Sequence, residues 1–329
     1  MIPPAALQQI RTILAKGKNF VLTTHVNPDG DGLGAEIALA LYLQQIGKAT
    51  HIFNHSDTPG NYAFLDPHNE IALFSAEKHA EIVRASDAIF ILDISDWKRL
   101  RDLGALIQNL PIPKVCLDHH PREDPFVDLD VIYPPASSTG EMIYALLTQL
   151  GGRIEGRLAQ ALYTAVMTDT GCFRFSNTTV GAFQVASALV AAGVQPHELY
   201  QKVYENQPPQ RMQLLAHILN HLHYEKNGRL AWFIVTQNNL ATTHTEVLDT
   251  EGFSDFPRTI AGVELSLMFM ETKEGKVKIS FRSKGKYSIN ALANRFGGGG
   301  HPYAAGALVD GKMQEVAPQV IAAAKELFE

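Results

Sequence analysis

The chain has 329 residues, enough for about two domains, and 46% of them are hydrophobic, as in ordinary globular proteins. Its net charge of −6 argues against a partner of long duplex nucleic acid, which usually requires a broad basic face. No apolar run approaches the ~20 residues of a membrane helix, and no signal-peptide pattern opens the chain, so we expect a cytoplasmic protein without a membrane partner. Cys116 and Cys172 both stand in apolar segments, which favours buried thiols in a reducing compartment.

Strand and helix patterns alternate through the first part of the chain. Short apolar runs predict strands at 20–25, 49–53, 88–95, 114–120 and 130–134. Helical patterns lie between several of these runs, as at 33–47 and 97–109, and helices dominate beyond residue 139. This alternation is typical of an α/β domain with a mostly parallel sheet, which we place at residues 1–192.

A proline-containing stretch at 193–210 interrupts the strand rhythm and predicts a linker between two domains. Residues 211–329 then form a smaller α+β domain. Its expected elements are a helix near 209–223, a strand at 229–236, two strands joined by a turn at Gly275, and helices at 288–296 and 313–328. The glycines at 297–300 are expected to form a loop, and the residues after them to begin a helix.

Acidic and histidine side chains follow the ends of several predicted strands. In chain order they are His25, Asp29 and Asp31, then Asp93, then Asp118, His119 and His120, with Asp169 added from an apolar helical segment. Because ligands of open α/β sheets collect outside the carboxyl ends of the strands, we expect these groups to converge on one crevice. Each has an ordinary alternative when taken alone, such as a helix cap for Asp29 or Asp93.

The types of side chain indicate a metal site. Carboxylates and imidazoles suit Mn²⁺, or Mg²⁺ with more difficulty, whereas thiolate-rich sites suit Zn²⁺. Six candidate ligands exceed the needs of one ion and fit two ions ~3.5–4 Å apart, an arrangement used for phosphoryl hydrolysis. We expect the glycines of "NPDGDGLG" to turn the backbone sharply enough for Asp29 and Asp31 to face different ions.

The second domain carries groups that could hold an anion. Residues 272–295 contain seven basic side chains against a single acid, Glu274. The glycine run could bring backbone N–H groups close to a phosphate, and Arg282 could add a bidentate donor. The candidate set is Arg282, Ser283, Gly298, Gly299, Gly300 and His301. A solvated hairpin face and a flexible glycine loop are the alternatives.

Taken together, these motifs resemble the DHH phosphoesterase family, in the branch with a DHH-associated C-terminal domain. "HVNPDGDGLG", "LDISD", "DHH" and "DTGCF" occur in the family's order, and "GGGGHPYAAG" is similar to the signature of the associated domain. The compact length is most similar to the stand-alone nano-RNase (oligoribonuclease)/pAp phosphatase type. The resemblance implies an active site in the cleft between the two domains, with 193–210 as a hinge.

The resemblance also implies a role for each candidate residue. One Mn²⁺ would be held by His25, Asp29 and Asp93, and the other by Asp31, Asp93, His119 and Asp169, with Asp93 bridging. A hydroxide between the ions would be the nucleophile. Asp118 would orient the histidines, and His120 would contact the scissile phosphate or assist the leaving oxygen. The nucleotide end of the substrate would be bound by Arg282, Ser283, Gly298, Gly299, Gly300 and His301.

The implied activity is Mn²⁺-dependent hydrolysis of very short oligoribonucleotides to mononucleotides, together with removal of the 3′-phosphate of pAp. The nearest alternative is hydrolysis of cyclic dinucleotides or of linear dinucleotides such as pGpG and pApA. RecJ-type exonucleases normally carry further modules, and family II inorganic pyrophosphatases are not expected to contain "GGGGH". A regulator that binds nucleotides without catalysis would show substituted ligands. The sequence leaves both a monomer and a homodimer open.

Overall fold

The computed structural model describes residues 1–122 and 126–328, which divide into two compact units, Met1–Asn206 and Gln207–Glu329. The division falls inside the segment 193–210 that the sequence marks as a linker. Part of this segment is helical, since α8 (Pro196–Tyr204) forms there and packs against the first unit. Among the described residues, no helix is both long enough and apolar enough to cross a membrane.

The first unit is built on a six-stranded sheet in which every neighbouring pair is parallel. Its order is β3-β2-β1-β4-β5-β6. The strands are β1 (Asn19–Thr23), β2 (Ala49–Asn54), β3 (Ile71–Leu73), β4 (Ala88–Leu92), β5 (Lys114–Asp118) and β6 (Leu129–Ile132). β4 and β5 are buried along their whole length, which explains why their sequences are continuous apolar runs. The sequence predicted all of these strands except the short β3.

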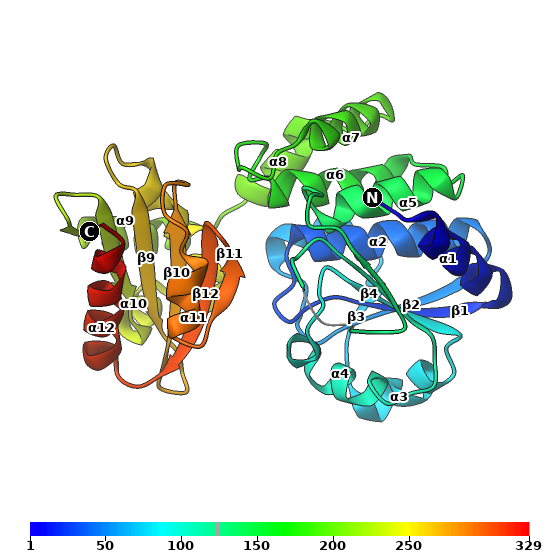
Figure 1. Ribbon diagram of the computed structural model, residues 1–329, viewed down its shortest axis with the longest axis horizontal. Helices are drawn as coiled ribbons and strands as arrows, with labels where there is room; N and C mark the ends of the chain where they lie inside the picture. The colour runs from blue at the N-terminus through cyan, green and yellow to red at the C-terminus, as the bar shows by residue number, and fades with distance from the viewer. Residues whose placement is uncertain (123–125, 329) are drawn as a thin grey trace. The chain divides into compact units, whose positions relative to one another are not determined.

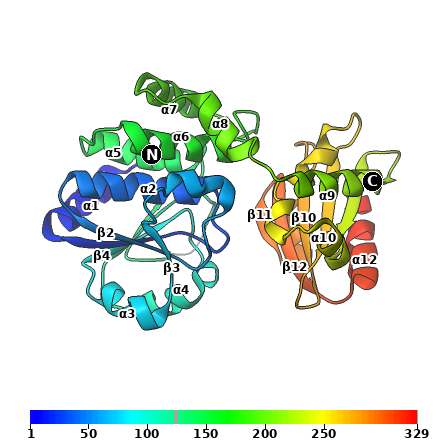
Figure 2. The ribbon, with the colours of Figure 1, turned by 180° about the vertical axis from the view of Figure 1, so that it is seen from behind.

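Helices cover both faces of this sheet, as Figures 1 and 2 show. α2, α5 and α6 lie over one face, α3 and α4 lie over the other, and α7 packs on the outer side of α6. The helices are α1 (Pro4–Lys16), α2 (Gly30–Gln45), α3 (Ala76–Arg84), α4 (Arg101–Ile107), α5 (Thr139–Gln149), α6 (Gly156–Asp169) and α7 (Val180–Ala191). The predicted α/β class is confirmed.

The strand order determines where a ligand can bind to the first unit. The chain places β2 and β3 on one side of β1, then crosses over to place β4, β5 and β6 on the other. Connections leaving the carboxyl ends of β1 and β4 therefore diverge, and this edge is where open α/β sheets bind their ligands. The segments that begin at Thr24 and Asp93 both start there.

The second unit contains a mixed sheet of order β11-β12-β10-β9-β8-β7, in which only the β8–β9 pair of the described strands is parallel. The strands are β7 (His223–Glu225), β8 (Leu230–Val235), β9 (Leu265–Glu271), β10 (Lys276–Ser283), β11 (Gly299–His301) and β12 (Ala304–Asp310). The helices are α9 (Pro209–Asn220), α10 (Gln237–Thr243), α11 (Asn290–Arg295) and α12 (Met313–Lys325). α12 packs on one face of the sheet and α9 on the other.

The residues after the glycine run form strand β12, so the predicted helix start is wrong. Ala305 and Ala307 are buried while Gly306 and Leu308 are exposed, which is the two-residue alternation of a strand. The glycines serve close pairing of β11 with β12. A Cβ added at Gly298 would lie 2.0 Å from the carbonyl oxygen of Gly306, a distance that no side chain tolerates.

Candidate metal centre

Asp29 and Asp31 lie at the first turn of α2 and have different surroundings. Asp29 caps the helix, because its Oδ1 accepts hydrogen bonds from the amides of Asp31 (3.0 Å) and Gly32 (3.2 Å). Its Oδ2 lies 3.8 Å from Nε2 of His25. Asp31 is only 1% exposed. The helix-cap explanation for Asp29 is therefore correct, and it leaves the second carboxylate oxygen facing a histidine.

The glycines of this stretch let α2 lie close to its neighbours and do not turn the backbone. All three belong to α2, and their φ angles lie outside the left-handed region: Gly30, Gly32 and Gly34. A Cβ at Gly30 would lie 2.5 Å from Oγ1 of Thr168, and one at Gly34 would lie 2.4 Å from the carbonyl oxygen of Ala161. The predicted sharp turn is wrong, because close approach to neighbouring residues requires glycine here: to α6 at Gly30 and Gly34, and to Thr24 at Gly32.

Asp93 belongs to two groups of side chains that could each hold a metal ion. It follows β4 with a φ of +59°, a left-handed conformation that is uncommon outside glycine. Its Oδ2 lies 3.5 Å from Nε2 of His25, and its Oδ1 lies 3.7 Å from Nε2 of His119. One group comprises His25, Asp29 and Asp93, the other Asp31, Asp93 and His119, and within each the ligating atoms lie within 4.8 Å of one another.

The N-terminus of α5 binds two of these carboxylates, a contact that the sequence did not indicate. The amide of Thr139 donates to Oδ2 of Asp31 (2.7 Å), and the amide of Gly140 donates to Oδ1 (2.8 Å). The hydroxyl of Thr139 donates to Oδ1 of Asp93 (2.9 Å). Unpaired amides at a helix N-terminus favour negative charge, so α5 stabilises both carboxylates. The local "SSTGE" pattern identifies a helix start but gives no sign of its partners.

Asp169 is the last residue of α6 and lies beside the second group, with its Oδ2 3.7 Å from Nε2 of His119. Asn177 holds it from the other side. The amide nitrogen Nδ2 of Asn177 donates to Oδ2 of Asp169 (2.9 Å), to the carbonyl of Asp169 (3.1 Å) and to the carbonyl of Ser137 (2.9 Å). Sequence reasoning missed Asn177, because nothing in the pattern around it distinguishes it from a turn residue.

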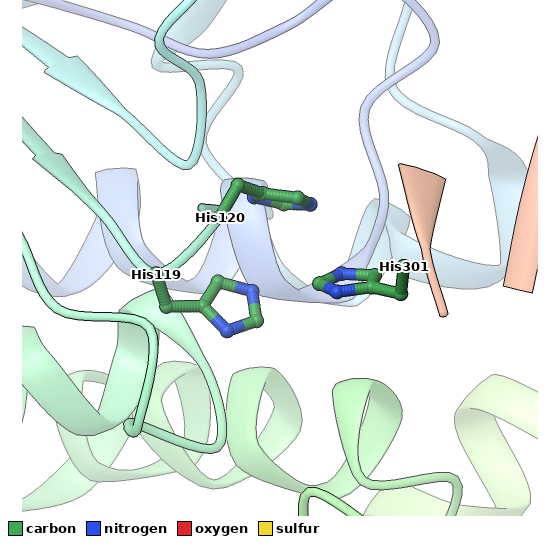
Figure 3. Close-up of side chains that lie close together, drawn as sticks. All are labelled: His119, His120 and His301. Atoms are coloured by element: carbon green, nitrogen blue, oxygen red, sulfur yellow. The ribbon is translucent and has the colours of Figure 1, made fainter. Parts of the chain in front are cut away.

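Asp118 and His120 form a pair at the end of β5. Asp118 is fully buried, and its Oδ1 accepts from the amide of His120 (3.0 Å) and lies 2.8 Å from Nδ1 of the same residue. Nδ1 of His120 also lies 3.6 Å from Oδ1 of Asp93. Figure 3 shows the rings of His119 and His120 leaving the same turn after the strand. Asp118 thus contacts His120 directly, and its predicted role in orienting the histidines stays a prediction.

The carboxylates of this centre crowd negative charge into a buried space. Burial, followed by the charges of Asp93 and Asp169, raises the pKa of Asp31 well above its ordinary value. Burial also raises the pKa of Asp169 to about 7. Burial would raise the pKa of Asp93 too, but His25 and the two neighbouring histidines lower it below its ordinary value. Buried like charges of this kind require a counter-charge, so the set of donors fits divalent cations.

His120 differs from the carboxylates in its protonation. Burial lowers the pKa of His120, but the hydrogen bond to Asp118 and the charge of Asp93 outweigh burial and raise this pKa to about 9. The ring therefore carries a proton at neutral pH in the protein without metal. A protonated imidazole can donate to an anionic oxygen, which is the chemistry of a general acid.

The predicted substrate-binding residues all lie in the second unit. Arg282, on β10, is partly buried, with its Nε 3.6 Å from Oδ2 of Asp255. Ser283 is 1% exposed, and its hydroxyl accepts from the amide of Gly285 (3.2 Å), which gives its side chain a local structural contact. Gly299 and Gly300 are exposed on β11, next to Gly298, and His301, drawn in Figure 3, ends that strand. Their role in binding a substrate stays a prediction.

Two family models match this chain, one in each of its two units. Residues 19–168 match the DHH family, N-terminal domain, and residues 241–329 match the DHHA1 domain. The chain is 29% identical over 306 residues to the bifunctional oligoribonuclease and PAP phosphatase NrnA of Thermus thermophilus, covering 93% of this chain and 89% of that protein. It is 30% identical over 308 residues to the probable enzyme of that name from Streptococcus mutans, covering 90% and 92%.

A solved structure agrees with these matches. The crystal structure of an exopolyphosphatase-related protein from Bacteroides fragilis superposes with a TM-score of 0.93 at 27% identity, covering 99% of this chain and 97% of that one. Both sequence and structural similarities therefore extend over nearly the whole chain. The chain belongs to the DHH family of phosphoesterases, in the branch that carries a DHHA1 domain.

Proposed function

We propose that the protein hydrolyses very short oligoribonucleotides to mononucleotides, and pAp to AMP, with two divalent cations, Mn²⁺ in the first place. The observation that carries this proposal is the pair of ligand groups that share Asp93. Two ions held close together are suited to displacement at phosphorus. The substrate class is supported by relatives of similar length that are named bifunctional oligoribonuclease and PAP phosphatase.

Six side chains of the first unit would hold the ions. His25, Asp29 and Asp93 would bind one ion, and Asp31, Asp93, His119 and Asp169 the other. When bound, the ions would supply a nucleophile at neutral pH and offset charge on the phosphoryl oxygens. Mixed oxygen and nitrogen ligands without thiolate favour Mn²⁺ over Zn²⁺, and Mg²⁺ or another divalent ion is the alternative.

His120 would handle the proton of the leaving oxygen. Its Nδ1 faces Asp118 at 2.8 Å, so the hydrogen bond to that carboxylate keeps a proton on Nδ1. We therefore assign Nε2 to the substrate, either to the scissile phosphate or to the departing oxygen. Asp118 acts through His120 by fixing the ring and stabilising its charged form.

The second unit would bind the nucleotide end of the substrate. Lys276, Lys278 and Arg282 occupy alternate positions of β10 and so share one face of that strand. A local basic strip suits a substrate of a few nucleotides, whereas a long strand needs a continuous groove. Arg282, the exposed glycines and His301 would contribute the donors to the nucleotide.

The test uses the purified full chain with Mn²⁺ and a labelled dinucleotide or pAp. We expect both to be converted to mononucleotides, and we expect EDTA to abolish the reaction. The Asp93→Asn variant should lose turnover while keeping its circular dichroism spectrum, because asparagine tolerates the left-handed backbone of this position. A protein that leaves both substrates intact in Mn²⁺ refutes the proposal.

A substrate panel distinguishes this function from its nearest alternative. The panel contains pAp, pGpG, RNAs of two to five residues, and cyclic dinucleotides. Preference for the short RNAs and pAp supports the proposal. Efficient opening of a cyclic dinucleotide with little cleavage of short RNA would instead identify a cyclic-dinucleotide phosphodiesterase.

A further inference from the structure

Thr139 contacts Asp93, which the two ligand groups share, and Asp31, which belongs to the second group. It is fully buried at the N-terminus of α5, with Ser138 as the cap of that helix. Its amide donates to Oδ2 of Asp31 at 2.7 Å, and its hydroxyl donates to Oδ1 of Asp93 at 2.9 Å. One residue therefore links the carboxylate of the second group to the carboxylate that both groups share.

The two oxygens of Asp93 face different partners. Oδ1 lies 3.7 Å from Nε2 of His119, and Oδ2 lies 3.5 Å from Nε2 of His25. The terminal torsion of an aspartate side chain is broad and roughly two-fold, so the Cα position alone does not hold the carboxylate plane. The hydroxyl of Thr139 bonds to Oδ1 only, and this bond selects the orientation in which each oxygen faces its own group.

We propose that Thr139 is a positioning residue for the two-ion centre. Its hydroxyl fixes the carboxylate plane of Asp93, so that Oδ1 is directed to the group of Asp31 and His119 while Oδ2 is directed to His25. This inference rests on the proposed two-ion function. It adds a residue that is not itself a metal ligand but affects metal binding. Groups that orient metal ligands typically change metal affinity by about 10–100-fold when they are removed.

Three variants separate the hydroxyl from other effects of substitution. Thr139→Val removes the hydroxyl and keeps the branched shape and the backbone amide. Thr139→Ser keeps the hydroxyl and loses a methyl group. Thr164→Val is the matched control, because Thr164 is also fully buried and its hydroxyl donates to the carbonyl of Gln160 within its own helix.

The measurement is calorimetric titration of Mn²⁺ into the metal-free full chain, which does not depend on turnover. We expect Thr139→Val to weaken Mn²⁺ binding by about 10-fold or more. Thr139→Ser should stay within about 3-fold of the wild type, since the hydroxyl is retained. Thr164→Val should titrate like the wild type. If Thr139→Val does not fold by circular dichroism, Thr139→Ala replaces it with the same expectation.

Each result decides the inference. Wild-type affinity in Thr139→Val, or equal weakening in Thr139→Ser, would overturn the role of the hydroxyl. A wild-type chain that binds no Mn²⁺ would overturn this inference together with the proposed function. A wild-type chain that binds Mn²⁺ but hydrolyses neither dinucleotide nor pAp would refute only the proposed substrates, because the binding comparison between the variants still tests Thr139.

Discussion

Gly34→Ala is expected to disturb the metal centre from outside it. Gly34 lies where α2 meets α6, and a Cβ there would be 2.4 Å from the carbonyl oxygen of Ala161 and 3.0 Å from Cβ of Ala165. Ordinary van der Waals contact begins near 3.4 Å, so the helices must separate locally by about 1 Å. Because α2 carries Asp31 and α6 ends at Asp169, this movement pulls apart two carboxylates of the candidate metal centre.

The magnitude follows from two opposing terms. Overpacking a tight contact costs about 1–3 kcal/mol of unfolding free energy. Alanine is a better helix former than glycine by about 1 kcal/mol, which offsets part of that cost. The net loss of up to about 2 kcal/mol lowers the Tm of a unit of this size by up to about 8 °C. The effect on turnover should be larger, since a displacement of about 1 Å at a reacting centre can cost about 100-fold.

Circular dichroism melting of the metal-free chain and Mn²⁺-dependent cleavage of a dinucleotide measure the two effects. Gly60→Ala is the matched control, because a Cβ at Gly60 would meet nothing within 4 Å. We expect Gly60→Ala to keep wild-type Tm and activity. If Gly34→Ala also kept both, the close approach of α2 and α6 would not position the carboxylates, and the reasoning would be refuted.

Three further predictions concern other parts of the molecule. Folding raises the pKa of Asp169 from 3.8 to about 7 and that of His120 from 6.5 to about 9. Because the folded chain then binds these protons more tightly than the unfolded chain, the stability of the metal-free protein should fall as the pH rises from about 4 to 9. A Tm that rises between pH 6 and 9 would contradict this. Asn177→Ala removes the hydrogen-bond donor to the Asp169 carboxylate and should raise the Mn²⁺ concentration that gives half-maximal activity by about 10-fold. If this concentration does not change, Asn177 does not position Asp169. Gly298→Ala should destabilise the second unit by about 2–3 kcal/mol, because its Cβ meets the carbonyl of Gly306. Faster amide hydrogen exchange in β11 and β12 would report this loss, and exchange as slow as in the wild type would contradict it.

The sequence was sufficient to predict that the acidic and histidine side chains at the strand ends of the first unit lie close together. Buried parallel strands are marked by apolar runs, and the carboxyl ends of parallel strands lie at one edge of their sheet. His25 and Asp93 follow two neighbouring strands, β1 and β4, and the structure brings their side chains to 3.5 Å. Strand ends therefore carry positional information that a single sequence reveals.

Contacts made across the fold were outside the reach of sequence reasoning. Thr139 is 108 residues from Asp31, and its local pattern indicates only the start of a helix. The role of the glycines in α2 could not be predicted for the same reason. A glycine in the sequence shows that a side chain is absent, but it does not show which neighbouring residue packs against that position. In the segment after His301, the small residues have only weak secondary-structure propensities, and the segment forms a strand because it pairs with β10.

The hydrogen bonds from α5 to Asp31 have a consequence for mutational analysis. Both come from main-chain amides, so replacing the side chain of Thr139 leaves these two donors in place, and Gly140 has no side chain to remove. Alanine at residue 139 would therefore leave the anchoring of Asp31 undetected, although two bonds of 2.7 and 2.8 Å are present. Replacing the amide of residue 139 or 140 by an ester, through chemical ligation, is the substitution that exposes it.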